Sequence, residues 1–101
     1  MTDDLIAALE DEWDLDQGFL GKLRQGIFDP VGLERLIRLL EGIDFGDSPE
    51  VNRRLVSLLW FMPLFIEWQR ERVHERGGDP QALMHATGRV QDSIIRILGF
   101  P

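Results

Sequence analysis

The chain has 101 residues, of which 44% are hydrophobic and 29% charged, as is usual for one globular domain and not for a disordered segment. Cysteine is absent, which excludes disulfides, thiolate metal sites and a cysteine nucleophile. The formal net charge of −7 has the opposite sign to that expected of a nucleic-acid-binding protein. We therefore expect a single acidic domain spanning residues 1–101 that binds no nucleic acid.

The sequence shows no sign of membrane targeting. The N-terminus has no basic region followed by an apolar core, so we expect no secretory signal. The longest apolar run, at residues 58–66, is nine residues long and contains Pro63, whereas crossing a bilayer takes about 20. We expect a cytoplasmic protein with no membrane partner.

The first 26 residues predict two helices. Residues 2–3 can cap the first helix. A short second helix is expected from about Asp16 to a left-handed stop at Gly26, and Gly18 and Gly21 weaken it by up to about 1 kcal/mol each relative to alanine. The apolar stripe of the first helix is Leu5, Ile6, Leu9 and Trp13.

Three pairs of a capping residue and a proline predict further helix starts, at 29–30, 48–49 and 79–80. The helix that starts at Pro30 is expected to end in a Schellman turn at Gly42, and the last helix is expected to stop at Gly99. Their predicted core stripes are Val31, Leu33, Leu36, Ile37 and Leu40 in the former, and Leu83, Met84, Val90, Ile94, Ile97 and Leu98 in the latter.

Between these two helices, residues 49–76 predict one apolar helix that is kinked or broken near Pro63, because this proline removes a hydrogen bond and crowds the carbonyl of Leu59. Residues 55–68 are apolar nearly all round, so this helix should run through the middle with the others packed about it. We expect it to cover Gly88, since a glycine inside a helix is unfavourable unless a neighbour approaches closely. The predicted fold is an all-α, single compact bundle of about five helices.

We find no cofactor or metal motif. His74 and His85 could meet across a helical hairpin near Glu71 and Glu75, but no H-E-x-x-H pattern is present. Glu67, Glu71 and Glu75 recur every four residues among arginines, as is typical of a solvated, salt-bridged helix face. We expect these residues to be exposed and to hold no metal.

The charge is distributed unevenly along the chain. Residues 1–50 contain 13 acids and four bases, a charge of −9, whereas residues 51–101 contain five acids and seven bases, a charge of +2. The acids gather in two clusters, which are Asp3, Asp4, Glu10, Asp11, Glu12, Asp14 and Asp16, and then Glu41, Asp44, Asp47 and Glu50.

An acidic surface with embedded aromatic residues speeds the encounter with a basic partner and then supplies contact energy. Trp13 and Phe45 both lie among carboxylates. The alternative is that Trp13 closes the core and the acids only keep the domain soluble. The candidate partner-binding residues are Asp11, Glu12, Trp13, Asp14, Asp16, Asp44, Phe45 and Asp47.

These features favour a non-enzymatic interaction module, an inhibitor or immunity-type protein that binds a basic protein such as a nuclease toxin. Small helical immunity proteins of bacterial toxins are similar in size and charge, which is a likeness of class without a shared motif. A second hypothesis is a homo-oligomeric structural or adaptor subunit, since the 55–68 segment carries more bulk than one small core can hold. The residues that supply this bulk are Trp60, Phe61, Phe65 and Trp68.

Two further alternatives stay open. A helix-turn-helix around residues 26–29 could bind DNA, but repulsion from the acidic half argues against it. An enzyme could use Arg70, Glu71 and His74, although no nucleophile, base and orienting group are recognisable together. The basic residues available to the helix-turn-helix are Lys22, Arg24, Arg35 and Arg38.

Overall fold

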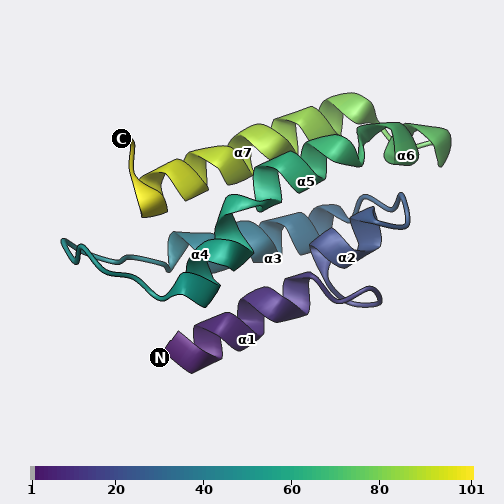
Figure 1. Cartoon of the computed structure of the whole chain (residues 1–101). Coiled ribbons are helices and arrows are strands. Elements are labelled where there is room, and N and C mark those ends of the chain that lie inside the picture. Colours follow the sequence, from purple (N-terminus) through teal and green to yellow (C-terminus); the bar gives the residue numbers. More distant parts are fainter. Residues whose placement is uncertain (1) are drawn as a thin grey trace.

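The computed structural model describes residues 2–101, and within them the chain forms seven helical segments and no strand (Figure 1). The predicted all-α class is therefore confirmed. The segments are α1 (Thr2–Glu12), α2 (Phe19–Leu23), α3 (Pro30–Glu41), α4 (Arg53–Trp60), α5 (Met62–Trp68), α6 (Arg70–Glu75) and α7 (Pro80–Leu98).

Two of the three predicted helix starts are confirmed in position. α3 begins at Pro30 and α7 begins at Pro80, but the Asp29 side chain makes no capping hydrogen bond and pairs with Lys22 instead. Asp79 caps α7 with its side chain, which accepts a hydrogen bond of 2.9 Å from the backbone N–H of Gln81. Proline fits the first helical position because its missing N–H would have no partner there.

The start predicted at Ser48-Pro49 is wrong. α4 begins at Arg53, and the Asn52 side chain caps it by accepting hydrogen bonds from the backbone N–H groups of Arg54 and Leu55, at 2.9 and 3.2 Å. The Ser48 hydroxyl instead donates to a carbonyl two residues further along. Asparagine is as good a cap as serine and stands directly before the apolar stripe, which explains the later start.

Helix ends follow the predicted glycines in two cases. Gly26 has a φ of +79°, and the chain after α2 closes a Schellman turn through hydrogen bonds from Ile27 to Lys22 and from Gly26 to Leu23. Gly99 ends α7 with a φ of +84°. Both residues adopt a backbone conformation that favours glycine.

The Schellman turn predicted at Gly42 is wrong. This residue ends α3 but has a φ of −81°, in the ordinary right-handed region. The guanidinium of Arg96, from α7, donates instead to the carbonyls of Leu40 and Ile43, at 2.7 and 3.0 Å. A distant side chain therefore adds hydrogen bonds at the end of α3, where the Leu40 carbonyl also accepts from the backbone N–H of Ile43.

The break predicted near Pro63 is confirmed. α4 ends at Trp60 and α5 starts at Met62, with Phe61 between them, and a second break follows at Gln69. Both linking residues stay near the right-handed helical region, with φ and ψ of −80° and −18° at Phe61 and of −87° and 0° at Gln69. α4, α5 and α6 thus form one kinked helical path.

The molecule is thin, with principal extents of 43 × 27 × 19 Å. Figure 1 shows α1 along one edge and α7 along the other, with α4 and α5 crossing between them. α4 packs against α1, and α5 packs against α2 and α7. Because 19 Å is only about two helix diameters, no helix can be surrounded on all sides.

One apolar core joins all seven segments, and α1 and α6 each add a single buried apolar side chain to it, Leu9 and Val73. Three residues of the predicted stripes lie outside the core, namely Val31, Met84 and Leu98, and Val31 is 73% exposed. The largest fully buried side chains are Phe19, Leu9, Leu20, Leu23, Leu36, Leu40, Leu59, Met62, Ile66, Leu83, Val73 and Val90.

The close packing predicted over Gly88 is wrong. A methyl group placed on this residue would meet no atom within 4 Å apart from its own helix. Gly88 instead lines a shallow groove between α5 and α7, beside Glu67 and Thr87. The thinness of the molecule leaves this side of α7 uncovered.

Candidate functional site

The exposed residues of α1 include four carboxylates and no basic side chain. They are Thr2, Asp3, Asp4, Ala7, Glu10 and Asp11. Residues spaced three or four apart share one helix face, so these carboxylates lie on the outer side of α1 in its first and last turns, with Ala7 between them. Glu10 pairs with Arg54 of α4, with Nη2 and Oε2 2.7 Å apart.

The fold also brings the second acidic cluster to one end of α1. Asp4 of α1 and Asp44 of the loop between α3 and α4 line the same shallow pocket. Asp14 and Asp16 lie beyond the other end of this helix. We call the resulting set the anionic edge, which comprises Asp3, Asp4, Asp11, Asp14, Asp16, Asp44 and Asp47.

Two carboxylates of the anionic edge also shape their loops. Asp14 Oδ2 accepts hydrogen bonds of 3.0 Å from the backbone N–H groups of Asp16 and Gln17. Asp44 Oδ1 accepts one of 2.8 Å from Gly46. Such local bonds hold the turns in place while the side chains stay exposed.

Glu12, by contrast, is a structural residue and is not accessible to a partner. Only 3% of the surface of Glu12 is exposed. Oε1 accepts from the backbone N–H of Phe19 and from Arg35 Nη2, at 3.1 and 2.8 Å, and Oε2 accepts from Arg35 Nε at 3.0 Å. The hydrogen bond to Glu12 raises the pKa of the Arg35 guanidinium. Glu12 therefore ties α1 to α2 and α3.

Trp13 and Phe45 are half-buried and pack against the core. The Trp13 ring meets Phe65 edge-on at 4.9 Å between centroids and lies 6.2 Å from Phe61. Its Nε1 is buried and has no hydrogen-bond partner within residues 2–101. Neither ring stands out among the acids as the sequence suggested, and the alternative in which Trp13 closes the core is the better description.

Two exposed tryptophans and an exposed leucine lie elsewhere, on α4 and α5. Trp60, Leu64 and Trp68 are 52%, 42% and 64% exposed. The Phe61 ring lies between the two indoles, 5.5 Å from Trp60 and 5.3 Å from Trp68. We call these four residues the aromatic face. The surplus of apolar bulk in this segment is confirmed, and the segment is central but open on one side.

Three of the four basic residues proposed for DNA contact have partners inside the molecule. Lys22 Nζ lies 2.9 Å from Asp29 Oδ2, and Arg35 binds Glu12. The Arg24 guanidinium lies over the Phe65 ring, 5.1 Å from its centroid. These contacts leave few cations for phosphate.

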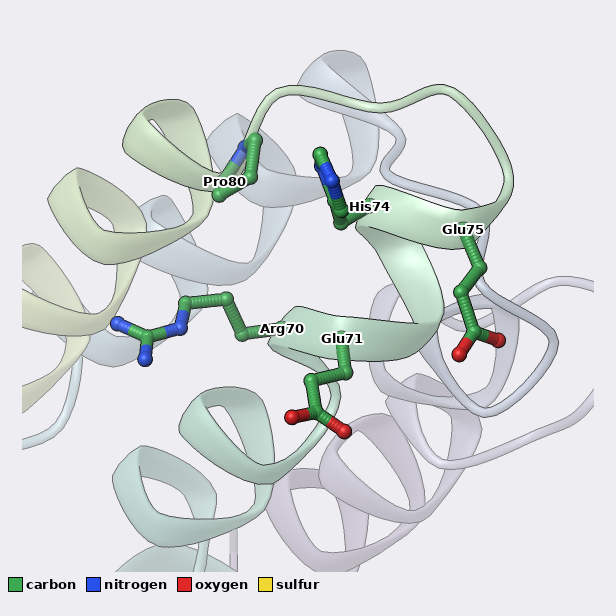
Figure 2. A pocket seen from close by; sticks show the side chains of 5 residues that line it. All are labelled: Arg70, Glu71, His74, Glu75 and Pro80. Atoms are coloured by element: carbon green, nitrogen blue, oxygen red, sulfur yellow. The ribbon is translucent and has the colours of Figure 1, made fainter.

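The residues of the enzyme alternative do not converge. Figure 2 shows a shallow pocket where α6 meets the start of α7, lined by Arg70, Glu71, His74, Glu75 and Pro80. The His74 ring is turned toward Pro80, whereas the Glu71 and Glu75 side chains hang from another side of α6 and Arg70 extends toward α7. Across residues 2–101, no three His, Asp or Glu side chains are placed to hold a metal ion.

Comparisons with known proteins give no match to a protein-family model, to a curated protein or to a solved structure. Among the helices formed by residues 2–101, none combines the length and apolar character needed to cross a bilayer.

Proposed function

We propose that this protein is a small interaction module that binds a basic protein partner through the anionic edge, as an inhibitor of immunity type would bind a nuclease toxin. One observation carries the proposal. Within residues 2–101, none of the seven carboxylates of the anionic edge forms an ion pair with the protein's own cations. Their charge is therefore available to the cations of another molecule.

The distribution of the carboxylates over the surface indicates what kind of partner would bind. Carboxylates along one helix and its two flanking loops form an extended negative surface, which attracts a basic protein over about a Debye length, roughly 8 Å at physiological ionic strength. This attraction raises the rate of encounter and suits a cleft built to hold phosphates. The same field repels nucleic acid. In this proposal the protein acts in the cytoplasm.

The test is capture of a partner from a lysate of the source organism by the immobilised full chain. The edge variant carries Asp3→Asn, Asp11→Asn and Asp16→Asn. The matched control carries Glu34→Gln, Glu67→Gln and Asp92→Asn, which gives the same net charge from acids outside the anionic edge. We expect a basic protein to be captured by the native chain and the control, and at least about fivefold less by the edge variant, with weaker capture at high salt.

Two outcomes contradict the proposal. One is that no basic protein is recovered at low salt. The other is that the edge variant and the control capture the same protein equally, because net charge and not the anionic edge then determines binding. If the captured protein is a nuclease, addition of the native chain should inhibit its activity in proportion to occupancy.

A further inference from the structure

The exposed residues of the α4–α6 path form a sequence pattern that is nearly symmetric about Leu64. Trp60 lies four residues before Leu64, and Trp68 lies four residues after it. Eleven residues before Leu64 is Arg53, and eleven residues after it is Glu75. All five residues are exposed. The apolar pattern is thus symmetric about Leu64, whereas Arg53 and Glu75, at equal distances from it, are opposite in charge.

The apolar part of this side is comparable in area with the largest apolar patch of a typical monomer. Trp60, Leu64 and Trp68 together expose about 350 Å², judged from the usual size of such side chains and their exposed fractions. Patches of this size on a monomer are often functional. Two copies packed through these residues would bury about 700 Å², and the flanking residues would bring the total to the roughly 1,000 Å² that a specific interface needs.

We infer that the aromatic face is the interface of an antiparallel homodimer with two-fold symmetry. In a two-fold interface the same patch serves both copies, and each contact occurs twice. With the axis at Leu64, this residue meets its own counterpart, and Trp60 packs against Trp68 of the partner subunit. Arg53 then faces Glu75 of the partner subunit. This inference does not rest on the basic-partner proposal.

The charges at the two ends of the path select a second copy as the occupant. Arg53 stands at the start of α4, whereas Glu71 and Glu75 stand on α6, and Figure 2 shows these two carboxylates extending from the same side of that helix. The two arginines of α6 are engaged elsewhere, because Arg70 extends toward Met84 of α7 and Arg72 donates to the carbonyl of Arg24. An antiparallel second copy sets opposite charges against each other at both ends. A parallel copy sets like charges together, and a uniformly basic partner meets repulsion at Arg53.

The first test is sedimentation of the full chain between about 1 and 500 μM. We expect a dimer that dissociates in the micromolar range, as small interfaces often do. Leu64→Glu places two carboxylates face to face on the axis and should weaken the dimer at least about 100-fold. Val31→Glu is the matched control, because it adds the same charge at a 73% exposed position of α3, outside the aromatic face. Circular dichroism checks that both variants stay folded.

The second test fixes the antiparallel register. Arg53→Glu and Glu75→Arg should each weaken the dimer about fivefold or more, because each sets like charges against one another across the interface. The double variant should restore it. The two residues lie 22 positions apart on one helical path, so they cannot rescue each other within one chain.

A chain that stays monomeric to 500 μM overturns the inference, as does a dimer that Leu64→Glu leaves intact or a double charge variant that does not recover. Capture of a different protein by a monomeric chain through this face overturns it as well. The two proposals are separable, since the edge variant should dimerise normally and Leu64→Glu should still capture the basic partner.

Discussion

Two glutamate–arginine pairs, each joined by two hydrogen bonds, differ in their exposure to water. The Glu12 side chain, paired with Arg35, is 4% exposed. The Glu34 side chain, paired with Arg89 across α3 and α7, is 54% exposed, and the hydrogen bond from Arg89 lowers the pKa of Glu34. A buried carboxylate that loses its partner cannot turn to water, whereas an exposed one can. Only the first pair should matter for stability.

Replacement of the buried carboxylate tests this difference. Glu12→Gln should lower the free energy of unfolding by about 2–3 kcal/mol, because Arg35 and the Phe19 N–H lose charge-assisted hydrogen bonds. Glu34→Gln should leave the urea unfolding curve unchanged. Equal losses in the two variants would contradict the assignment of Glu12 to the structure of the domain.

The Lys22–Asp29 pair gives a prediction for pH. The hydrogen bond from Lys22 lowers the pKa of Asp29 below its ordinary value of 3.8. A lowered pKa in the folded state contributes stability that is present above the ordinary pKa and is lost as the pH falls through the lowered one. Asp29→Asn should therefore cost about 0.5–1 kcal/mol at pH 7 and nothing at pH 2. Chemical unfolding of both proteins between these pH values measures the difference, which should shrink only below about pH 4.

At the scale of single elements, close backbone contacts require glycine at some positions of this chain and not at others. A side chain on Gly21 would collide with the backbone carbonyl of Asp14, and one on Gly18 would collide with that of Glu12. α2 therefore lies directly against the chain that follows α1, which a larger residue would prevent. The weak helix that the sequence predicts here results from the need for this close approach.

Alanine substitutions should separate these glycines. Gly21→Ala should destabilise the protein by about 2–4 kcal/mol, because backbone must move to admit the methyl group. Gly88→Ala should stabilise it by about 0.5–1 kcal/mol, since α7 gains a better helix former in open space. Thermal and urea unfolding measure both, and a destabilised Gly88→Ala would mean that a neighbour does cover this site.

The start of α4 provides a second test at this scale. Asn52→Ala should cost about 1 kcal/mol, because two backbone N–H groups lose their acceptor. Ser48→Ala should change the unfolding free energy by less than about 0.5 kcal/mol, as its hydroxyl bonds only within an exposed loop. The reverse order of effects in urea unfolding would contradict the helix start at Arg53.

At the scale of the whole molecule, thinness determines what is exposed. A chain of 101 residues spread over 43 × 27 Å is about two helices deep, so α4 and α5 are covered by α1, α2 and α7 on their inner sides only. The exposed indoles are a consequence of this shape. The same shape places the anionic edge and the aromatic face on different helices, which allows them to serve different partners.

Dimerisation through the aromatic face has a thermal consequence. Association stabilises the folded state by mass action, so the melting temperature of the native chain should rise with protein concentration between about 2 and 200 μM. Leu64→Glu should melt at one temperature throughout this range. Differential scanning calorimetry measures both, and a concentration-independent native melting temperature would count against the dimer.

Much of the helical structure could be predicted from local sequence alone. The start signals at residues 29–30 and 79–80, the stop at Gly26 and the break near Pro63 act within one or two turns of backbone, so neighbouring residues determine them. The uneven charge was also evident, since α1 carries acids in its first and last turns and no base. The hydrophobic pattern identified most of the core for the same reason.

Tertiary structure alone decided which side chains are accessible. Glu12 looks like any other acid in its cluster until Arg35, 23 residues later, folds against it. Arg96, more than 50 residues later in the chain, donates hydrogen bonds to the carbonyls of Leu40 and Ile43 at the end of α3. The apolar run of residues 55–68 signals burial on every side, yet helix packing in a thin molecule covers only part of it. Local patterns cannot specify such contacts, because they depend on how separate helices meet.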